Sequence, residues 1–234
     1  RYPSAGTTNA EVVLALVALD GTTTDVDWGG GPGGDFEYLA GVRWVAGEPL
    51  TLTVQTRDQR TLAVLTVDQV TGVVTEYYRV TDDNWVELVP GSPRWWEGSL
   101  LTVEDRGGTR RLVVDGEPLS PDGLQIRSVQ GIHDYGVLVS ASTDPVDVDV
   151  IRVERGGSVE VISGGGGVCS AVEGGGTLAV SRSDLDGISL EVSGHLVSSL
   201  AEQPLVTPTP DFHVVGERDV RSAVLFPSDH DGSP

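Results

Sequence analysis

Residues 42–80 read VRWVAGEPLTLTVQTRDQRTLAVLTVDQVTGVVTEYYRV, and this stretch decides the fold class. It contains four short runs rich in Val, Leu, Thr and Tyr, the kinds of residue that pack well on the pleated surface of a sheet. Segments with Gly, Pro and Asp, which favour turns, separate the runs. The pattern predicts one antiparallel meander with strands at residues 42–45, 50–56, 61–68 and 73–80.

The same pattern of short strands and turns recurs along the chain. Three further units occupy residues 94–119, 126–163 and 171–200. The four units start roughly 30 to 50 residues apart, which is the period of a propeller blade of four strands. Residues 12–19 and 22–28 read as the last two strands of an earlier blade. We therefore predict an all-β protein in which residues 1–203 form a partial β-propeller, with about four four-stranded antiparallel blades plus part of a fifth.

Two stretches interrupt this pattern. Residues 29–34 (GGGPGG) have too little apolar surface to order themselves, so we expect a mobile loop between blades. Beyond residue 203, three prolines indicate an extended connector: Pro204, Pro208 and Pro210. Residues 212–226 then read as a new amphipathic segment. We expect residues 204–234 to form a linker and the first strand leading toward another domain.

The charge of the chain excludes two classes of partner. It has 35 acidic and 15 basic residues, all of the latter Arg, and a formal net charge of −20. Such a charge repels phosphate backbones and anionic lipid surfaces, so we expect neither nucleic-acid nor membrane partners. The absence of Lys and Met fits the codon bias of a high-GC bacterial genome. A salt-adapted source is the alternative explanation of the acidity.

Cysteine use and hydropathy indicate the compartment. The single Cys169 excludes an intrachain disulfide framework and leaves a thiolate metal site without a second ligand. The longest apolar run, residues 12–19, is too short to span a bilayer, and no signal-peptide pattern opens the chain. We expect a cytoplasmic protein, with upstream targeting as the open alternative.

Neither the histidines nor the densest carboxylate group predicts a metal site. The four histidines are His133, His195, His213 and His230. They are isolated from one another and lack zinc-ligand spacing, so we expect them on the surface or in turns. The carboxylate group comprises Asp144, Asp147 and Asp149. It lacks the Gly and the distal Glu of an EF-hand loop, so a solvated face is favoured over a calcium site.

The sequence predicts no catalytic centre. It contains no Gly-x-Ser-x-Gly nucleophile elbow, and Cys169 has no His nearby along the chain. The glycine runs at residues 29–34 and 164–167 are not followed by Lys-Ser or Lys-Thr, which makes them loops rather than phosphate-binding motifs. We therefore expect no catalytic residue and no cofactor.

Four tryptophans are candidates for the core. Trp44, Trp85, Trp95 and Trp96 lie at or just before the starts of predicted blades. Large aromatic side chains at such positions favour packing between blades. An aromatic platform for a ligand is the alternative.

Several motifs, in order along the chain, resemble dipeptidyl peptidase IV propellers of the prolyl oligopeptidase clan. The opening RYPSAGTTNA (residues 1–10) resembles the family's Tyr-Pro-Lys-Ala-Gly-x-x-Asn segment, and VQTRDQ (54–59) resembles its Arg-x-Gln blade strand. VDQVTG (67–72) is similar to an Asp-x-x-(Thr/Ser)-Gly hairpin and NWVE (84–87) to a Gly-Trp-Val segment. AVLFP (223–227) is similar to the first strand of the hydrolase domain.

The resemblance implies the place of this chain in a larger protein. In that family an eight-bladed propeller caps an α/β-hydrolase domain and filters peptides toward a Ser-Asp-His triad. The triad lies after the matched region, and the paired glutamates that hold the substrate's amine lie before it, so no catalytic or amine-binding residue carries over. Positions after Trp85 correspond to residues that line the outer substrate sub-sites. Here they are Leu88 and Val89, where the best-known members have an aromatic and a basic residue.

These observations lead to one expected function and one alternative. We expect the C-terminal half of the propeller of a bacterial dipeptidyl peptidase IV-like serine peptidase, which scaffolds and gates peptide access to a hydrolase domain absent from this chain. The chain alone is expected to be inactive. Its expected partners are peptide substrate through the parent enzyme, the hydrolase domain or remaining blades, and itself by self-association through uncovered apolar faces. A free-standing propeller that binds other proteins is the alternative function, and a closed four-bladed ring is the alternative assembly.

Overall fold

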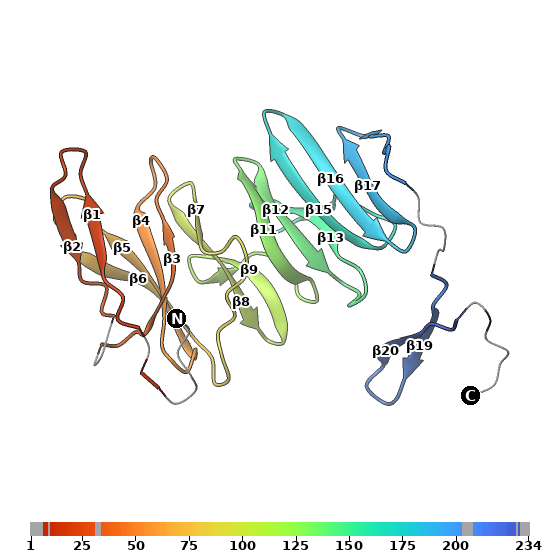
Figure 1. Ribbon diagram of the computed structural model, residues 1–234, viewed down its shortest axis with the longest axis horizontal. Helices are drawn as coiled ribbons and strands as arrows, with labels where there is room; N and C mark the ends of the chain where they lie inside the picture. Colours follow the sequence, from red (N-terminus) through yellow and green to blue (C-terminus); the bar gives the residue numbers. More distant parts are fainter. Residues whose placement is uncertain (1–6, 9, 31–33, 203–207, 228, 230–234) are drawn as a thin grey trace. The chain divides into compact units, whose positions relative to one another are not determined.

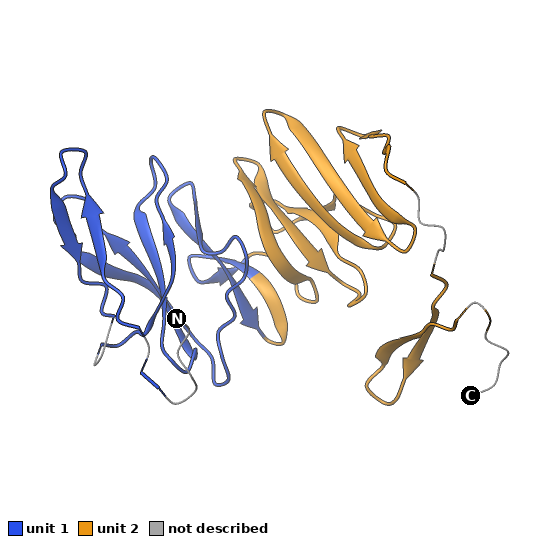
Figure 2. Ribbon diagram, viewed as in Figure 1, with its two compact units in different colours: residues 1–106, 112–118 blue, residues 107–111, 119–234 orange. Residues whose placement is uncertain are grey.

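The computed structural model describes residues 7–8, 10–30, 34–202, 208–227 and 229 (Figure 1). Within these ranges the chain forms twenty strands and no helix, which confirms the predicted all-β class. No helix there has the length and apolar character that a membrane crossing requires. Figure 2 shows two compact units: Arg1–Arg106 with Leu112–Pro118 (unit 1), and Gly107–Arg111 with Leu119–Pro234 (unit 2).

The first half of the chain forms three antiparallel sheets. In the first, β1 (Leu14–Val17) pairs with β2 (Thr23–Val26), near the predicted remnant of an earlier blade. The second has the order β3-β4-β5-β6 and consists of β3 (Tyr38–Arg43), β4 (Leu50–Gln55), β5 (Thr61–Val67) and β6 (Val74–Thr81). The third has the order β10-β9-β8-β7 and consists of β7 (Arg94–Trp96), β8 (Ser99–Arg106), β9 (Thr109–Val114) and β10 (Glu117–Pro118).

Two more four-stranded sheets and one hairpin complete the described chain. The first sheet contains β11 (Gln125–His133), β12 (Gly136–Ser142), β13 (Asp149–Val153) and β14 (Val159–Val161) in that order. The second contains β15 (Val168–Gly174), β16 (Thr177–Asp184), β17 (Gly187–Val192) and β18 (His195–Leu196). The hairpin pairs β19 (Asp211–Val215) with β20 (Val220–Val224), where the sequence predicts a new amphipathic segment.

The first strand of the meander is the one that departs from prediction. The sequence predicts a strand at residues 42–45, but β3 begins at Tyr38 and ends at Arg43. The following residues form a turn, in which the Glu48 amide donates to the Val45 carbonyl at 3.1 Å and Gly47 has a φ of +83°. The prediction of a strand at Trp44 and Val45 is therefore wrong, because these apolar residues lie where the backbone already turns. The other three strands start and end within one residue of prediction.

Strand β4 is the centre of the unit 1 core, because all six of its residues are buried. One face belongs to an apolar cluster that joins the meander to β2 and the segment after it. The cluster contains Val26, Trp28, Phe36, Leu50, Leu52, Val54, Ala63, Leu65 and Val67. On the other face, the hydroxyl of Thr51 accepts a hydrogen bond of 2.7 Å from the Trp95 indole nitrogen. The meander is thus covered on both faces, as a blade within a stack would be.

The tryptophans divide into two pairs. Trp95 and Trp96 are buried, and Trp95 packs with Leu62, Val64 and Leu100, which confirms the core role predicted for them. Trp44 and Trp85 are instead 58 % and 60 % exposed. The core prediction is wrong for these two, because both lie in connecting segments between strands rather than in strands that face another sheet.

The hairpin between β5 and β6 explains the Asp-x-x-Thr-Gly motif. The Asp68 carboxylate accepts hydrogen bonds from the Thr71 amide at 2.8 Å and the Val70 amide at 3.0 Å, so the side chain closes the turn. Gly72 follows with a φ of +72°, and a Cβ there would lie 2.4 Å from the Asp25 carbonyl oxygen. Only glycine fits this approach of the hairpin to β2.

In unit 2, two sheets are joined by a small apolar core. Leu138 of β12 and Val150 of β13 pack with Cys169 and Ala171 of β15. All four side chains are buried, which also removes the single thiol from solvent. The prediction of a mobile loop at residues 29–34 concerns positions of which 31–33 lie outside the described residues. Pro204 and part of the predicted connector lie outside them as well.

Candidate functional site

The segment after β6 contains the two residues predicted to line substrate. Its first turn is closed by Asp82, whose carboxylate accepts hydrogen bonds from the amides of Asn84 at 2.7 Å and Trp85 at 3.3 Å. The Val86 amide then donates to the Gln59 carbonyl at 2.7 Å. The buried Gln55 side chain donates to the Val86 carbonyl at 2.9 Å. Residues 82–88, called here the Trp85 segment, are therefore held against the β4–β5 hairpin.

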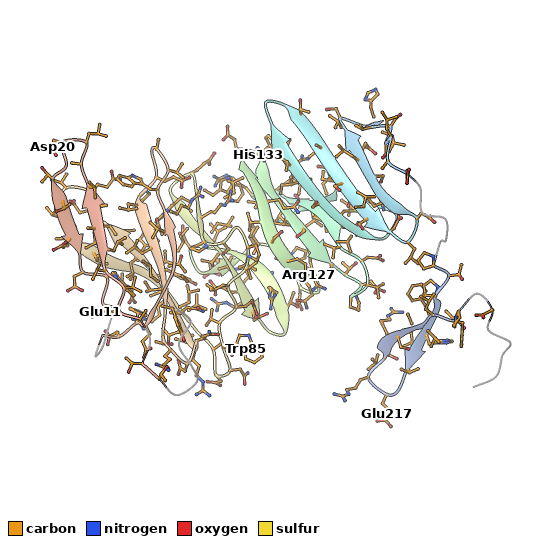
Figure 3. The ribbon with its side chains drawn as sticks, viewed as in Figure 1. Glu11, Asp20, Trp85, Arg127, His133 and Glu217 are labelled. Atoms are coloured by element: carbon orange, nitrogen blue, oxygen red, sulfur yellow. The ribbon has the colours of Figure 1, made fainter. Side chains whose placement is uncertain are left out.

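The Trp85 segment presents apolar side chains beside a hollow of about 280 Å³. Trp85, labelled in Figure 3, and Leu88 are exposed at its rim. Gln55, Gln59 and Glu87 supply its polar groups. Val89 follows directly but is buried. Of the two predicted residues, Leu88 therefore borders the hollow, whereas Val89 is buried and is not part of its lining. Contact of either with a peptide remains a prediction.

A buried carboxylate, that of Glu104, lines a second, smaller hollow together with Val89. Only 2 % of the Glu104 side chain is exposed, and Arg106 donates to its Oε2 from Nε at 3.0 Å and from Nη2 at 2.6 Å. Thr102 donates to Oε1 at 2.5 Å. Burial and the Glu104 charge raise the pKa of Tyr78, although Arg106 partly opposes them. Both carboxylate oxygens of Glu104 are paired, so the group does not offer a reactive acid.

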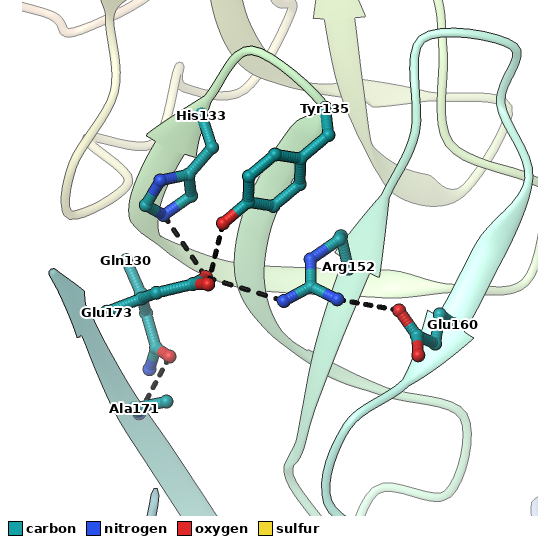
Figure 4. A network of polar contacts seen from close by, with 7 residues as sticks. All are labelled: Gln130, His133, Tyr135, Arg152, Glu160, Ala171 and Glu173. Carbon is teal, nitrogen blue, oxygen red and sulfur yellow. Dashed lines mark hydrogen bonds and ion pairs between the residues drawn. The ribbon is translucent and has the colours of Figure 1, made fainter. Parts of the chain in front are cut away.

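A second polar cluster, shown in Figure 4, joins the two four-stranded sheets of unit 2. Its centre is Glu173 of β15, whose side chain is 11 % exposed. Glu173 accepts a hydrogen bond of 2.6 Å from the Tyr135 hydroxyl. It also forms an ion pair with Arg152 Nη2 at 3.4 Å, and His133 Nε2 lies 3.3 Å from its Oε2. Arg152 in turn binds Glu160 through Nη1 at 2.7 Å.

The three partners of Glu173 are layered on one another. The rings of His133 and Tyr135 stack with centroids 5.1 Å apart and an interplanar angle of 5°. The Arg152 guanidinium lies 5.2 Å from the Tyr135 ring centroid. Burial acts to raise the pKa of Glu173, but the Tyr135 hydrogen bond and the charges of His133 and Arg152 outweigh it and hold the pKa below its ordinary value. The carboxylate stays ionised and acts as a structural tie between sheets.

The other predicted polar residues are separated from one another. His133 is half-buried at the end of β11, directly before the turn at residues 134–135, whereas His195 and His213 are exposed, as expected. His230 lies outside the described residues. Each carboxylate of the Asp144, Asp147 and Asp149 group has its own partner: Arg221, the Gly167 amide and the Ser163 hydroxyl, respectively. No group of three metal-binding side chains occurs among the residues that the structure describes.

Two carboxylates of these clusters, Glu173 and Glu104, have a signal in the sequence outside the motifs named above. Glu173 follows Cys169 and Ala171 at strand spacing, which places a carboxylate on the buried face of β15. Glu104 of β8 lies in phase with the buried Leu100 and Thr102 in the same way. A charged residue in phase with buried positions predicts a paired carboxylate, although not the partner.

Comparison with known proteins decides the family. Residues 1–118, just over half of the chain, match the family model described as the dipeptidyl peptidase IV (DPP IV) N-terminal region. The chain belongs to this family. The resemblance stated from the sequence motifs is therefore confirmed. No curated protein matches the chain.

Two solved structures share the fold of this DPP IV N-terminal region. Porphyromonas gingivalis dipeptidyl peptidase 4 aligns with a TM-score of 0.80 at 15 % identity, over 99 % of this chain and 37 % of that chain. A Bacteroides ovatus protein described as a dipeptidyl aminopeptidase IV aligns with a TM-score of 0.76 at 16 % identity, over 99 % of this chain and 39 % of that one. The predicted propeller fragment is thereby confirmed. The chain spans less than two fifths of the length of either structure.

The lowered carboxylate pKa values predict loss of stability in acid. The pKa of Asp68 is lowered from 3.8 mainly by the Thr71 amide, and that of Glu173 from 4.5, where its partners outweigh burial. As the pH falls, the unfolded chain therefore binds protons first, so the stabilisation is present above about pH 4.5 and is lost below it. We therefore expect the urea concentration at the midpoint of unfolding to decrease as the pH is lowered from about 5.5 to about 3.5.

The net charge acts in the opposite direction, because protonation relieves the self-repulsion of a chain with charge −20. Unfolding is therefore best followed in about 0.5 M salt, which screens that repulsion. A urea midpoint that stays constant or rises over this pH interval would show that the paired carboxylates do not stabilise the fold.

Proposed function

We propose that the chain is a non-catalytic portion of the propeller of a DPP IV-like serine peptidase, where it forms a scaffold and gates peptide access to a hydrolase domain. The match of residues 1–118 to the DPP IV N-terminal region carries this proposal. The shared fold with two chains more than twice as long supports it. Peptidase chemistry would then be supplied by another part of the parent protein.

The Trp85 segment is the part of the chain best suited to touch a peptide. Hydrogen bonds of Val86 with the Gln59 carbonyl and the Gln55 side chain hold it against the β4–β5 hairpin. Asp82 closes its first turn. It exposes Trp85 and Leu88 at the rim of the 280 Å³ hollow. An aromatic side chain on an anchored backbone offers contact area at little cost in conformational entropy. Leu88 would contribute apolar contact, and the carboxamides of Gln55 and Gln59 line the same hollow.

Peptide binding to the chain itself tests this role. We expect unlabelled peptides of about ten residues with Pro at the second position to bind with a Kd of about 0.1 to 1 mM, as suits one small hollow. Trp85→Ala should weaken binding at least about fivefold, through loss of the aromatic contact. Isothermal titration calorimetry measures both, and liquid chromatography of the mixtures should show intact peptides.

Trp44→Ala is the matched control, because Trp44 is 58 % exposed but lies outside the hollow. It should bind peptide as the unmodified chain does. Equal losses in both variants, or no binding at 5 mM peptide (about five times the weakest Kd expected), would contradict a gating role for the Trp85 segment. The proposal as a whole also requires a Ser-Asp-His hydrolase region in the same reading frame.

A further inference from the structure

Glu87 places a carboxylate at the hollow beside the Trp85 segment. The side chains that line this hollow are those of Gln55, Gln59, Trp85, Val86, Glu87 and Leu88. Within the described part of the chain, Glu87 contributes the one charged side chain of this lining. Glu87 is exposed, as are Trp85 and Leu88. An aromatic ring, an aliphatic side chain and a carboxylate therefore border the same hollow.

The fold does not use the Glu87 carboxylate. Among the residues that the structure describes, none donates a hydrogen bond to it or forms an ion pair with it. The neighbouring carboxylates differ in this respect. That of Asp82 closes the first turn of the Trp85 segment, and that of Glu104 is paired with Arg106. The Glu87 carboxylate is thus available to a ligand that enters the hollow.

The positive charges near the hollow do not balance this carboxylate. Arg57, in the turn between β4 and β5, pairs with Glu37, and Arg79 of β6 pairs with Glu76. Arg60 follows Gln59 along the chain but does not line the hollow. The Trp85 segment itself contains three acidic residues and no basic one. The hollow therefore favours a cationic group over an anionic one.

We propose that the hollow binds a peptide through an Arg side chain, whose guanidinium pairs with Glu87 and lies against the Trp85 ring. The inference rests on the peptide contact proposed for the Trp85 segment. Trp is the aromatic side chain that attracts cations most strongly. A guanidinium is planar, so it can stack on an indole ring while two of its N–H groups donate to one carboxylate. The compact ammonium of Lys offers neither the planar face nor the paired donors.

A contact with Glu87 must be separated from the attraction of the whole chain. A net charge of −20 attracts any cationic peptide, wherever that peptide binds. Many carboxylates share in that attraction, and salt screens it. The proposed contact depends instead on one carboxylate and on the ring beside it. Removal of the Glu87 charge should therefore matter more than removal of another acidic charge from the same segment.

Isothermal titration calorimetry with paired peptides tests the proposal. Both members of a pair have about ten residues and Pro at the second position, and they differ only in having Arg or its uncharged isostere citrulline at one interior position, which is varied from pair to pair. At about 0.15 M salt the Arg member of the best pair should bind about five- to tenfold more tightly. Glu87→Gln should lower this ratio to about twofold, the part left to the Trp85 ring. Glu87→Lys should abolish the preference, because like charges then repel.

Asp83→Asn is the matched control, since it removes the same charge from an exposed position of the Trp85 segment that does not line the hollow. It should keep the preference for Arg, and circular dichroism melts check that all variants remain folded. A ratio below about twofold in every pair, or equal losses in Glu87→Gln and Asp83→Asn, would overturn the inference.

The citrulline peptides distinguish this inference from the proposed function. If they bind, and bind more weakly to Trp85→Ala, the peptide contact of the Trp85 segment stands even where Arg brings no gain. Absence of binding by either member of every pair up to about 5 mM would contradict both proposals.

Discussion

Leu138→Ala is expected to lower the free energy of unfolding of unit 2 by about 3 kcal/mol. Leu138 is fully buried at the centre of β12, where it packs with Val150, Cys169 and Ala171. Removal of its side chain leaves a cavity at the point where the two four-stranded sheets of unit 2 meet. The loss therefore combines the transfer energy of the missing methyl groups with the cavity that remains. Urea denaturation followed by circular dichroism measures the change.

Leu185→Ala is the control for this prediction. Leu185 lies in the exposed β16–β17 turn, so its removal should change the stability by less than about 0.5 kcal/mol. If Leu138→Ala and Leu185→Ala shift the urea midpoint equally, the β12–β15 contact is not part of a packed core.

Glu173→Ala is expected to cost about 2 to 3 kcal/mol, the range for loss of a charged acceptor from a largely buried network. Glu173 is 11 % exposed and is the shared acceptor for Tyr135 and Arg152, and His133 Nε2 lies 3.3 Å from the same carboxylate. Its removal leaves a guanidinium nitrogen and a phenol hydroxyl without their acceptor. Glu160→Ala removes the exposed carboxylate of the same network and should cost less than about 1 kcal/mol.

A double-mutant cycle isolates the Glu173 contact with the phenol. Tyr135→Phe keeps the ring stacked between His133 and Arg152 but removes the hydroxyl that donates at 2.6 Å. In the presence of Glu173 we expect this change to cost about 1 kcal/mol, and in Glu173→Ala almost nothing. Additive effects of the two substitutions would show that the hydroxyl and the carboxylate do not interact.

Local sequence patterns determined most of the secondary structure. The Val- and Leu-rich runs of the meander became β4, β5 and β6 within one residue of prediction, because alternation and turn residues act over a few positions. The Asp68 turn could be predicted from the sequence for the same reason, since its carboxylate accepts hydrogen bonds from amides two and three residues away. The prediction that Leu88 lines a binding site came from the resemblance to the DPP IV family rather than from any local pattern.

Contacts between distant residues decided the rest. Trp85 and Trp95 are the same residue type, yet one is exposed and the other is buried beside Thr51, 44 positions away along the chain. Glu173 meets Tyr135 across 38 positions, and Gln55 holds the Trp85 segment across 31. A single strand shows which side chains share a face, but not which sheet will cover that face. The partner is chosen by packing of whole sheets, and that choice is made only in the tertiary structure.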